Sequence, residues 1–268
     1  MRRVLAPLAA TASVLGLLAV PAGALASGGH SPPSLTCTSA EPFYSGTYDN
    51  VTVPPDQSCN LSSSTVQGSV TVETDSSLDL ENSGTVGGSL LVGTGGTASE
   101  DSGWVISGAA AAHNADSLSF TGTVHGIVGN NTGTLALSSA TIDGSIVWNK
   151  GLYGGVIGAS VITGQVIVNG TAGDPLVGGS WLIAGPQLDS SPQEIDGNLV
   201  LTGNQVPIYV FDNHIRQNLV CEGNNPAPFT SLGGFGNAID GHSVGQCATT
   251  NPATGANAAT ARAAIAAG

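Results

Sequence analysis

The sequence predicts an all-β fold, a parallel β-helix wound from a single chain in about eleven right-handed coils. A short pattern recurs along the chain, since "TVQGSVTV" at residues 65–72 returns as "TVGGSLLV" at residues 85–92. Apolar side chains alternate with other residues on both sides of a central glycine, which is typical of β-strands. Glycine accounts for 39 of 268 residues and charged residues for 9%, a composition that argues against a helical or α/β domain.

The central glycine gives each repeat a register. Successive units are about 20 residues apart, whereas propeller blades need about 40. The units also lack the leucine spacing of leucine-rich repeats. We therefore expect stacked coils over residues 49–248, each hydrogen-bonded to the next. The anchor positions are Asp49, Gly68, Gly88, Gly108, Gly126, Gly144, Gly164, Gly179, Gly197, Gln217 and Gly241.

The apolar residues near each anchor are expected to point inward. Two residues before three of the anchors stand Ile142, Ile162 and Ile195, which the register places in one interior column. A second apolar pair, such as Leu78 and Leu80, follows ten and twelve residues after the anchor. Each coil should therefore contain at least two strands around one continuous core.

Residues 1–26 are typical of a removable export signal. Arg2 and Arg3 precede an apolar run over residues 4–20, and the following "PAGALAS" contains a small-residue cleavage pattern. A membrane anchor is the alternative, but the run is short for a span and contains Pro7. We expect the mature protein to be secreted.

Four cysteines follow the predicted signal, at Cys37, Cys59, Cys221 and Cys247. In an oxidising compartment they are expected to form two disulfides, for which three pairings exist. The open ends of a solenoid expose unpaired backbone and need caps. Because the cysteines lie near the two ends, we predict Cys37–Cys59 and Cys221–Cys247, with residues 27–48 forming an N-terminal cap segment.

The repeats "TVQGSVTV", "EIDGNLVL" and "HIRQNLVCEGNNPAP", with the final "GQC", resemble secreted actinobacterial proteins that carry β-helix repeats. The architecture is also similar to bactofilins and to the pectin-lyase-like fold, which includes polysaccharide lyases. This resemblance implies a β-helix. The signal and the four cysteines depart from bactofilins, so their end-to-end polymerisation is not implied.

Three residues after the anchor, where a side chain should face solvent, the later coils carry apolar residues. An apolar stripe on a wet face usually marks a covered surface. The candidates for the cover are the Ala-rich tail, residues 249–268, as a short helix or disordered segment, and another rod or a cell-envelope partner. The predicted interaction stripe comprises Val147, Ile167, Leu182, Val200 and Val220.

Two polar columns are interpreted as structural. Opposite charges alternate between neighbouring coils at Asp196, Arg216 and Asp240, which should attract. An asparagine ladder is predicted at a turn, from Asn131, Asn149 and Asn169, because stacked amides bond one another along the rod.

The sequence offers little that resembles a catalytic site, and we assign no catalytic residue. Glu81 stacks in register on Asp101, so a shared Ca²⁺ or plain solvated turns are the two interpretations. No other cofactor is expected. The basic groups of the rod, Lys150 and Arg216, lie away from that pair, and the histidines occupy different registers.

The formal net charge of −13 makes nucleic acid and anionic lipid poor partners. No later segment is long and apolar enough to span a bilayer. We therefore expect a secreted structural or adhesive rod, acting through its surfaces, with self-association or a cell-envelope partner. The alternative is a β-helix that binds or degrades polysaccharide.

Overall fold

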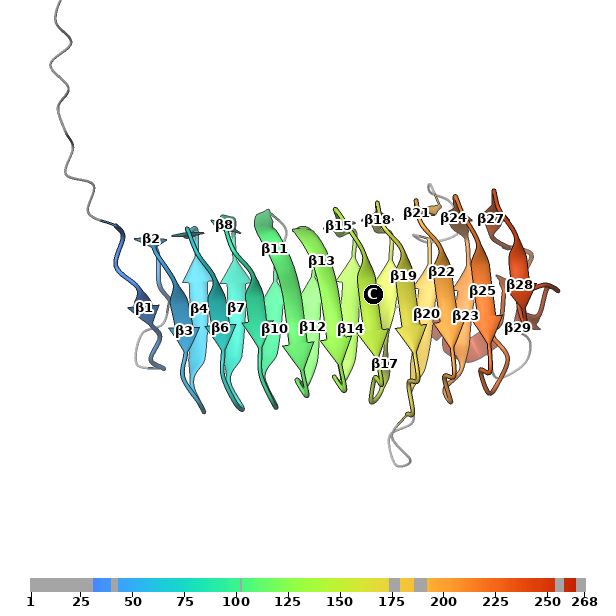
Figure 1. The fold of residues 1–268 in the computed structure, drawn as a ribbon, viewed down its shortest axis with the longest axis horizontal. Helices are drawn as coiled ribbons and strands as arrows, with labels where there is room; N and C mark the ends of the chain where they lie inside the picture. Colours follow the sequence, from blue (N-terminus) through green and yellow to red (C-terminus); the bar gives the residue numbers. More distant parts are fainter. Residues whose placement is uncertain are drawn as a thin grey trace, which may run out of the picture. The chain divides into compact units, whose positions relative to one another are not determined.

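The computed structural model describes residues 31–39, 43–101, 103–173, 179–185, 192–253 and 258–263. The unit Pro32–Gly268 is a parallel β-solenoid of about ten turns with a period of about 20 residues, as the repeat predicts (Figure 1). The predicted export signal, residues 1–26, lies outside the described residues.

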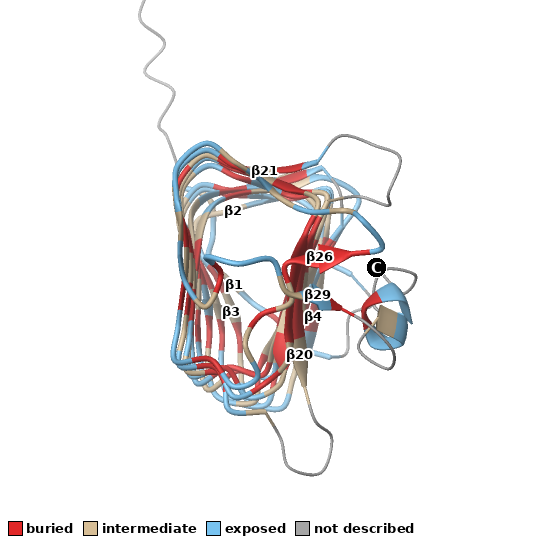
Figure 2. Ribbon diagram, turned by 90° about the vertical axis from the view of Figure 1, so that its right-hand side faces the viewer, coloured by how far each residue is buried: buried red, intermediate tan, exposed pale blue. Residues whose placement is uncertain are grey.

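The coils form three faces (Figure 2), although the last two coils contribute no strand to the third face. The first, named here the stripe face, contains β3 (Val51–Val53), β6 (Val70–Val72), β9 (Leu90–Val92), β16 (Ile146–Asn149), β19 (Val166–Asn169), β22 (Leu199–Thr202), β25 (Leu219–Glu222) and β28 (Ser243–Gly245). The second contains β2 (Thr47–Tyr48), β5 (Thr65–Val66), β8 (Gly84–Val86), β15 (Thr141–Ile142), β18 (Val161–Ile162), β21 (Gln193–Ile195), β24 (Asn213–Ile215) and β27 (Ala238–Ile239). Two long strands, β11 (Trp104–His113) and β13 (Thr123–Asn130), continue from the second face onto the stripe face and pair with strands of both.

The third face, the back sheet, is a separate eight-stranded parallel sheet. Its strands are β4 (Ser58–Ser62), β7 (Ser77–Glu81), β10 (Thr97–Glu100), β12 (Ser117–Phe120), β14 (Thr134–Ser138), β17 (Gly154–Gly158), β20 (Ser180–Ala184) and β23 (Ile208–Phe211). Two short strands, β26 (Ser231–Leu232) and β29 (Pro252–Ala253), pair with each other, and residues 258–263 form a helical turn.

The interior column that the sequence predicts is present. Ile142 pairs with Ile162, and Ile162 pairs with Ile195. All three side chains are fully buried. The second apolar pair is inward too, because Leu78 and Leu80 face the core from the back sheet. Burial of such columns along the solenoid is a major favourable contribution to its stability.

The anchor glycines are needed because neighbouring coils come very close. A Cβ at Gly88 would lie 2.8 Å from the carbonyl oxygen of Gly68, and one at Gly197 would lie 2.6 Å from that of Gly164. The backbone N–H of Gly197 donates to the Gly164 carbonyl oxygen at 2.9 Å. Any larger residue would push two coils apart.

One predicted coil does not exist, and the turn count falls from eleven to about ten. β18 and β19, around Gly164, pair directly with β21 and β22, around Gly197. Gly179 therefore does not anchor a coil but precedes β20 in the back sheet of the same turn. The error arose because the "VGGSWLI" segment has the apolar spacing of an anchor, while insertions lengthen this turn.

Both predicted disulfides form, Cys37–Cys59 and Cys221–Cys247. At the N-terminal end, β1 (Leu35–Thr36) from the predicted cap segment pairs with β3. It supplies hydrogen-bond partners to the edge of the first coil. At the other end, Cys247 is tied to Cys221 of the preceding coil. The disulfides thus hold chain segments against both ends of the coil stack.

Candidate functional site

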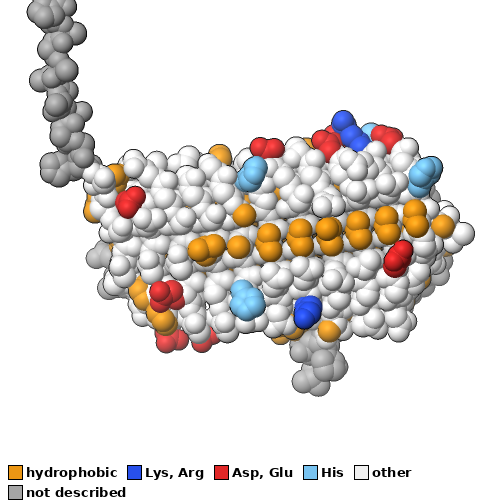
Figure 3. All heavy atoms as spheres, in the orientation of Figure 1, with side chains coloured by type: hydrophobic (Ala, Val, Ile, Leu, Met, Phe, Trp, Pro, Cys, Tyr) orange, Lys and Arg blue, Asp and Glu red, His pale blue; other side chains and the backbone are white. Residues whose placement is uncertain are grey.

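The main surface feature of the solenoid is a straight apolar column on the stripe face, visible as a continuous orange row in Figure 3. Its members project outward from consecutive coils and are half-buried by one another, with Leu91 at 44% and Val244 at 42% exposure at the two ends. Thr52 and Thr71 precede it in the same register. We define the stripe as Leu91, Ala111, Val128, Val147, Ile167, Val200, Val220 and Val244.

The structure brings four of the five predicted stripe residues together and corrects the fifth. Val147, Ile167, Val200 and Val220 occupy successive positions of one column. Leu182 lies instead on β20 in the back sheet, paired with residues of β17 and β23. The misplaced anchor at Gly179 put it in the wrong register.

Leu182 belongs to a second apolar cluster, which the tail covers. The outward column of β17, β20 and β23 packs against β26, β29 and the helical turn 258–263, where Ala261 is fully buried. Tyr209 stacks on Phe229, with ring centroids 5.3 Å apart. Figure 2 shows the helical turn beside the face that contains β4 and β20. The described residues of the tail therefore cover part of the back sheet and do not lie on the stripe.

Removing the tail should expose this second cluster. We expect truncation after Ala248 to lower the free energy of unfolding by about 2–4 kcal/mol, because Leu182, Tyr209 and Phe211 lose apolar cover. Binding of a hydrophobic fluorescent dye should increase, because the truncated protein exposes this apolar cluster. Ala259→Asp, at an exposed position of the helical turn, is the control and should leave both measurements nearly unchanged. Equal dye binding by the truncated protein and Ala259→Asp would contradict this assignment.

Polar columns flank the stripe on both sides. On one side Asn130, Asn149, Asn169 and Thr202 are in register. The amide of Asn149 donates to Asn130 at 3.3 Å, and the hydroxyl of Thr202 donates to Asn169 at 3.1 Å. Asn130, not the predicted Asn131, shares this column. The coil of Gly144 contains one extra residue at its bend relative to the coil before it, which shifted the expected register.

Asn131 instead begins the turn that follows the ladder. It has a positive φ of 52°, as do Lys150 (53°) and Gly170 (70°) in the next two coils. Residues that tolerate left-handed backbone are required at this corner, which favours asparagine and glycine there. The side chain of Asn131 donates to Asn114 at 2.7 Å, so a short second ladder lies beside the first.

The predicted charge column is present at the far end of the second face. Arg216 binds Asp196 at 3.0 Å and Glu194 at 3.2 Å. Asp240 lies one coil further, but its partner is His214, at 3.2 Å. These half-exposed polar contacts link three coils and give Arg216 two carboxylate partners.

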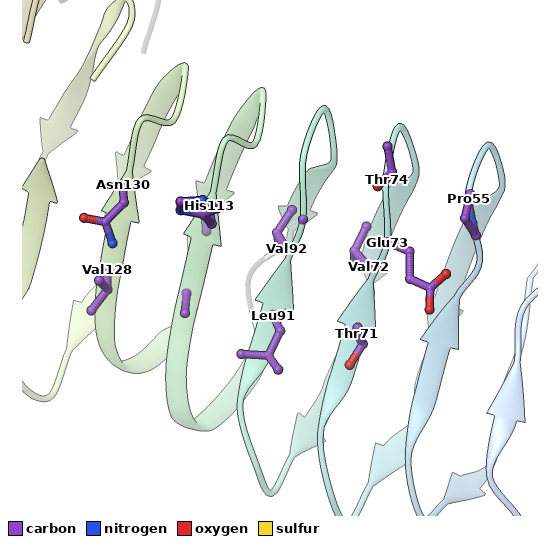
Figure 4. Close-up of a pocket in the computed structure, with 13 residues that line it drawn as sticks. Pro55, Thr71, Val72, Glu73, Thr74, Leu91, Val92, His113, Val128 and Asn130 are labelled. Atoms are coloured by element: carbon purple, nitrogen blue, oxygen red, sulfur yellow. The ribbon is translucent and has the colours of Figure 1, made fainter. Parts of the chain in front are cut away.

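A groove of about 530 Å³ lies over the first part of the stripe (Figure 4). Glu73 and His113 border it, and one coil lies between the coils that contain these two residues. Gly93, which has no side chain, occupies the equivalent position between them. Ala111, the smallest member of the stripe, lies on the groove floor between Leu91 and Val128. The hollow thus results from small residues in a regular array.

The predicted Ca²⁺ ligands, Glu81 and Asp101, lie on neighbouring coils and both are exposed. In the described part of the chain, no group of three or more histidine, cysteine or acidic side chains is positioned to hold a metal ion. Two carboxylates alone supply a small part of the six to eight oxygens that Ca²⁺ takes.

Phenylalanine, tyrosine and tryptophan side chains, which commonly stack on sugars, are absent from the described lining of the groove. Trp104, Trp148 and Trp181 are each at most 1% exposed. Trp148 and Trp181 contact each other edge to face inside the core, with centroids 6.2 Å apart. The tryptophans therefore serve the interior.

One buried carboxylate was not predicted. Glu100 points inward between Leu80 and Phe120 and is 3% exposed. Burial raises its pKa, three backbone N–H groups offset part of that effect, and the charge of Asp101 raises the pKa further. The interior register, twelve residues after the anchor Gly88, could have identified it.

No protein-family model matches the chain, and searches of curated proteins and of solved structures return no match. Within the described residues, no helix is both long and apolar enough to span a bilayer. The two disulfides are compatible with an extracellular protein.

Proposed function

We propose that the protein is a structural or adhesive rod of the extracellular space or cell envelope, which acts by contact through the stripe face and without catalysis. The observation that carries this proposal is the unbroken apolar stripe over eight successive coils. Soluble monomers rarely expose apolar side chains in so regular an array unless something binds there. The parallel β-solenoid supplies the rigid, flat support that such a contact needs.

A sedimentation experiment tests this function. The protein, at a concentration too low for self-association, is mixed with washed envelope fragments of the producing cells and centrifuged. We expect the wild type to sediment with the envelopes, and Val147→Asp to lose at least about 80% of this binding, because a carboxylate at the centre of the stripe must be desolvated. Thr141→Asp, in the same coil but on the second face, is the control. Equal loss in both variants, or no binding by any of the three, would contradict the proposal.

The groove favours a second candidate, a polysaccharide-binding protein. It combines apolar floor residues with Glu73, His113 and Asn130 at its borders, the usual mixture for a small polar ligand. Acidic and neutral polysaccharides, with and without Ca²⁺, should be tested for binding and for release of shorter products. Cleavage that is lost in Glu73→Gln would replace the structural function with an enzymatic one.

A further inference from the structure

We propose that the stripe face binds a second copy of this chain, with the two rods antiparallel and face to face. This inference rests on the proposed function and names its partner. Among the described residues the stripe is at the surface, while the tail already occupies the other apolar cluster. Within the described chain, no segment packs over the stripe.

The charge distribution permits such a dimer although the protein is acidic. The sequence contains 18 acidic residues. Between the coils of Leu91 and Val244, however, the columns on either side of the stripe contain a single carboxylate, Glu222, among the described residues. Depletion of charge at the centre of a surface patch is characteristic of protein interfaces. Close contacts between like charges are therefore few at this face, although both copies carry a net negative charge.

Regular spacing favours a copy of the same rod over a partner of different architecture. The stripe presents one side chain per coil, at the strand separation of about 4.8 Å. A second stripe has the same repeat, so every side chain meets an equivalent one along the whole contact. A partner with another period would fall out of register within a few coils.

The flanking columns favour the antiparallel orientation. When the two-fold axis passes between the coils of Val147 and Ile167, these two residues face each other across the interface. The coil of Ala111 then faces the coil of Val220, so His113 lies opposite Glu222 of the other copy. Asn149 likewise faces Asn169, which is an amide pair. In the parallel orientation, the column that contains Asn149 and Asn169 would face the column on the other side of the stripe in the second copy. Neither pair would then form.

The same alignment avoids like charges. Glu73 lies one coil before Leu91 and projects beyond the last coil of the other copy. His242, at the far end, faces Ser89. No two carboxylates of the stripe face are thus brought opposite each other, which is the electrostatic complementarity that selects one orientation.

The contact area suits a reversible dimer. Seven coil steps give a length of about 34 Å, and three outward columns span about 14 Å. Each copy would bury about 500 Å², or about 1,000 Å² for the pair, which is the lower limit for a specific interface. We therefore expect dimerisation between about 10 and 500 µM rather than a permanent complex.

Sedimentation equilibrium of the full chain over this concentration range tests the inference. The wild type should form dimers, and Val147→Asp should weaken dimerisation at least about 100-fold, since each dimer would bury two unpaired carboxylates. Thr141→Asp, on the second face of the same coil, should dimerise like the wild type. Circular dichroism of each variant checks that the solenoid is retained.

A charge exchange tests the orientation. Val128 faces Val200 in this alignment. Val128→Lys and Val200→Asp should each be monomeric alone, and a 1:1 mixture should form a heterodimer, because the lysine of one copy meets the aspartate of the other. A mixture of Val128→Lys and Val128→Asp should remain monomeric, because the two charges would be three coil steps, about 14 Å, apart. Rescue by the second mixture instead of the first would overturn the antiparallel alignment.

A wild type that stays monomeric at 500 µM would overturn the second copy as the partner. The proposed function would survive that result if monomers still sediment with envelopes in a manner that depends on Val147. It would fail together with the dimer if neither measurement responds to Val147→Asp. The two failures are therefore distinguishable.

Discussion

Replacing Ile162 with lysine is expected to abolish the native solenoid around its seventh coil. Ile162 is fully buried between Ile142 and Ile195. A lysine there would place an unpaired charge in the apolar column, at a cost of at least about 3–5 kcal/mol. In a stacked array that loss also uncouples the coils on either side, since each coil is stabilised by its neighbours. Ile162→Ala should be milder, lowering the free energy of unfolding by about 2–5 kcal/mol.

The matched control lies one residue earlier on the same strand. Val161 points outward and is 44% exposed, and it pairs with Glu194 of the next coil. Val161→Lys should change the free energy of unfolding by about 0.5 kcal/mol or less. Urea unfolding followed by circular dichroism measures all three variants. If Val161→Lys unfolded the protein and Ile162→Lys did not, the inside and outside of the strand would be reversed.

The inward residues could be predicted because the interior of a solenoid imposes the same requirement on every coil. Ile142, Ile162 and Ile195 each stand two residues before an anchor, and all three stack as expected. The disulfides were predictable for a related reason, since only the two ends of such a stack lack a neighbouring coil. Repetition thus allowed one register to be checked many times.

Prediction failed where a single coil departs from the repeat. Leu182 was placed on the stripe because its segment imitates an anchor, but the turn between Gly164 and Gly197 contains insertions that no neighbouring coil shares. Asn131 was misplaced by one residue at a bend. The tail is one of the two expected covers of the stripe, but its described residues pack on the back sheet, whose outward apolar cluster no periodic pattern predicts. Such features depend on contacts between elements rather than on a periodic pattern.

Glu100 is a departure of another kind, since its position was predictable and its role was not. It occupies an inward position, between Leu80 and Phe120 in the back sheet. Its carboxylate accepts hydrogen bonds from the backbone N–H groups of Thr121 at 2.9 Å and Gly122 at 2.6 Å, and from that of Trp104 at 3.3 Å. It therefore accepts hydrogen bonds from backbone donors at two bends, one before β11 and one before β13. In these two coils a single continuous strand replaces the corner between the second face and the stripe face.

Replacing Glu100 with leucine is accordingly expected to destabilise the protein, although it would restore an apolar column. The backbone donors of Thr121 and Gly122 would lose their acceptor, at about 1–3 kcal/mol for each buried group. Part of this cost is offset by the buried leucine, which leaves a net loss of about 2–4 kcal/mol. Glu100→Gln keeps one acceptor oxygen and should lose less stability than Glu100→Leu.

Glu81→Gln is the control. It removes an exposed carboxylate of the same sheet and should change the free energy of unfolding by about 0.5 kcal/mol or less. A Glu100→Leu variant as stable as the wild type would show that the bends do not depend on this carboxylate.

The pH dependence of Glu100 has a definite sign. Burial raises its pKa in the folded chain, so the folded protein binds the proton more tightly than the unfolded protein does. The resulting stabilisation is fully present below the unfolded value of about 4.3 and is lost as the pH rises through the raised folded pKa. The wild type should therefore gain stability relative to Glu100→Gln as the pH falls through this window, because glutamine does not titrate. Thermal unfolding of both proteins across that range measures the difference. A wild type that instead lost stability relative to Glu100→Gln on acidification would mean that the three backbone donors outweigh burial and that the folded carboxylate is held in its charged form.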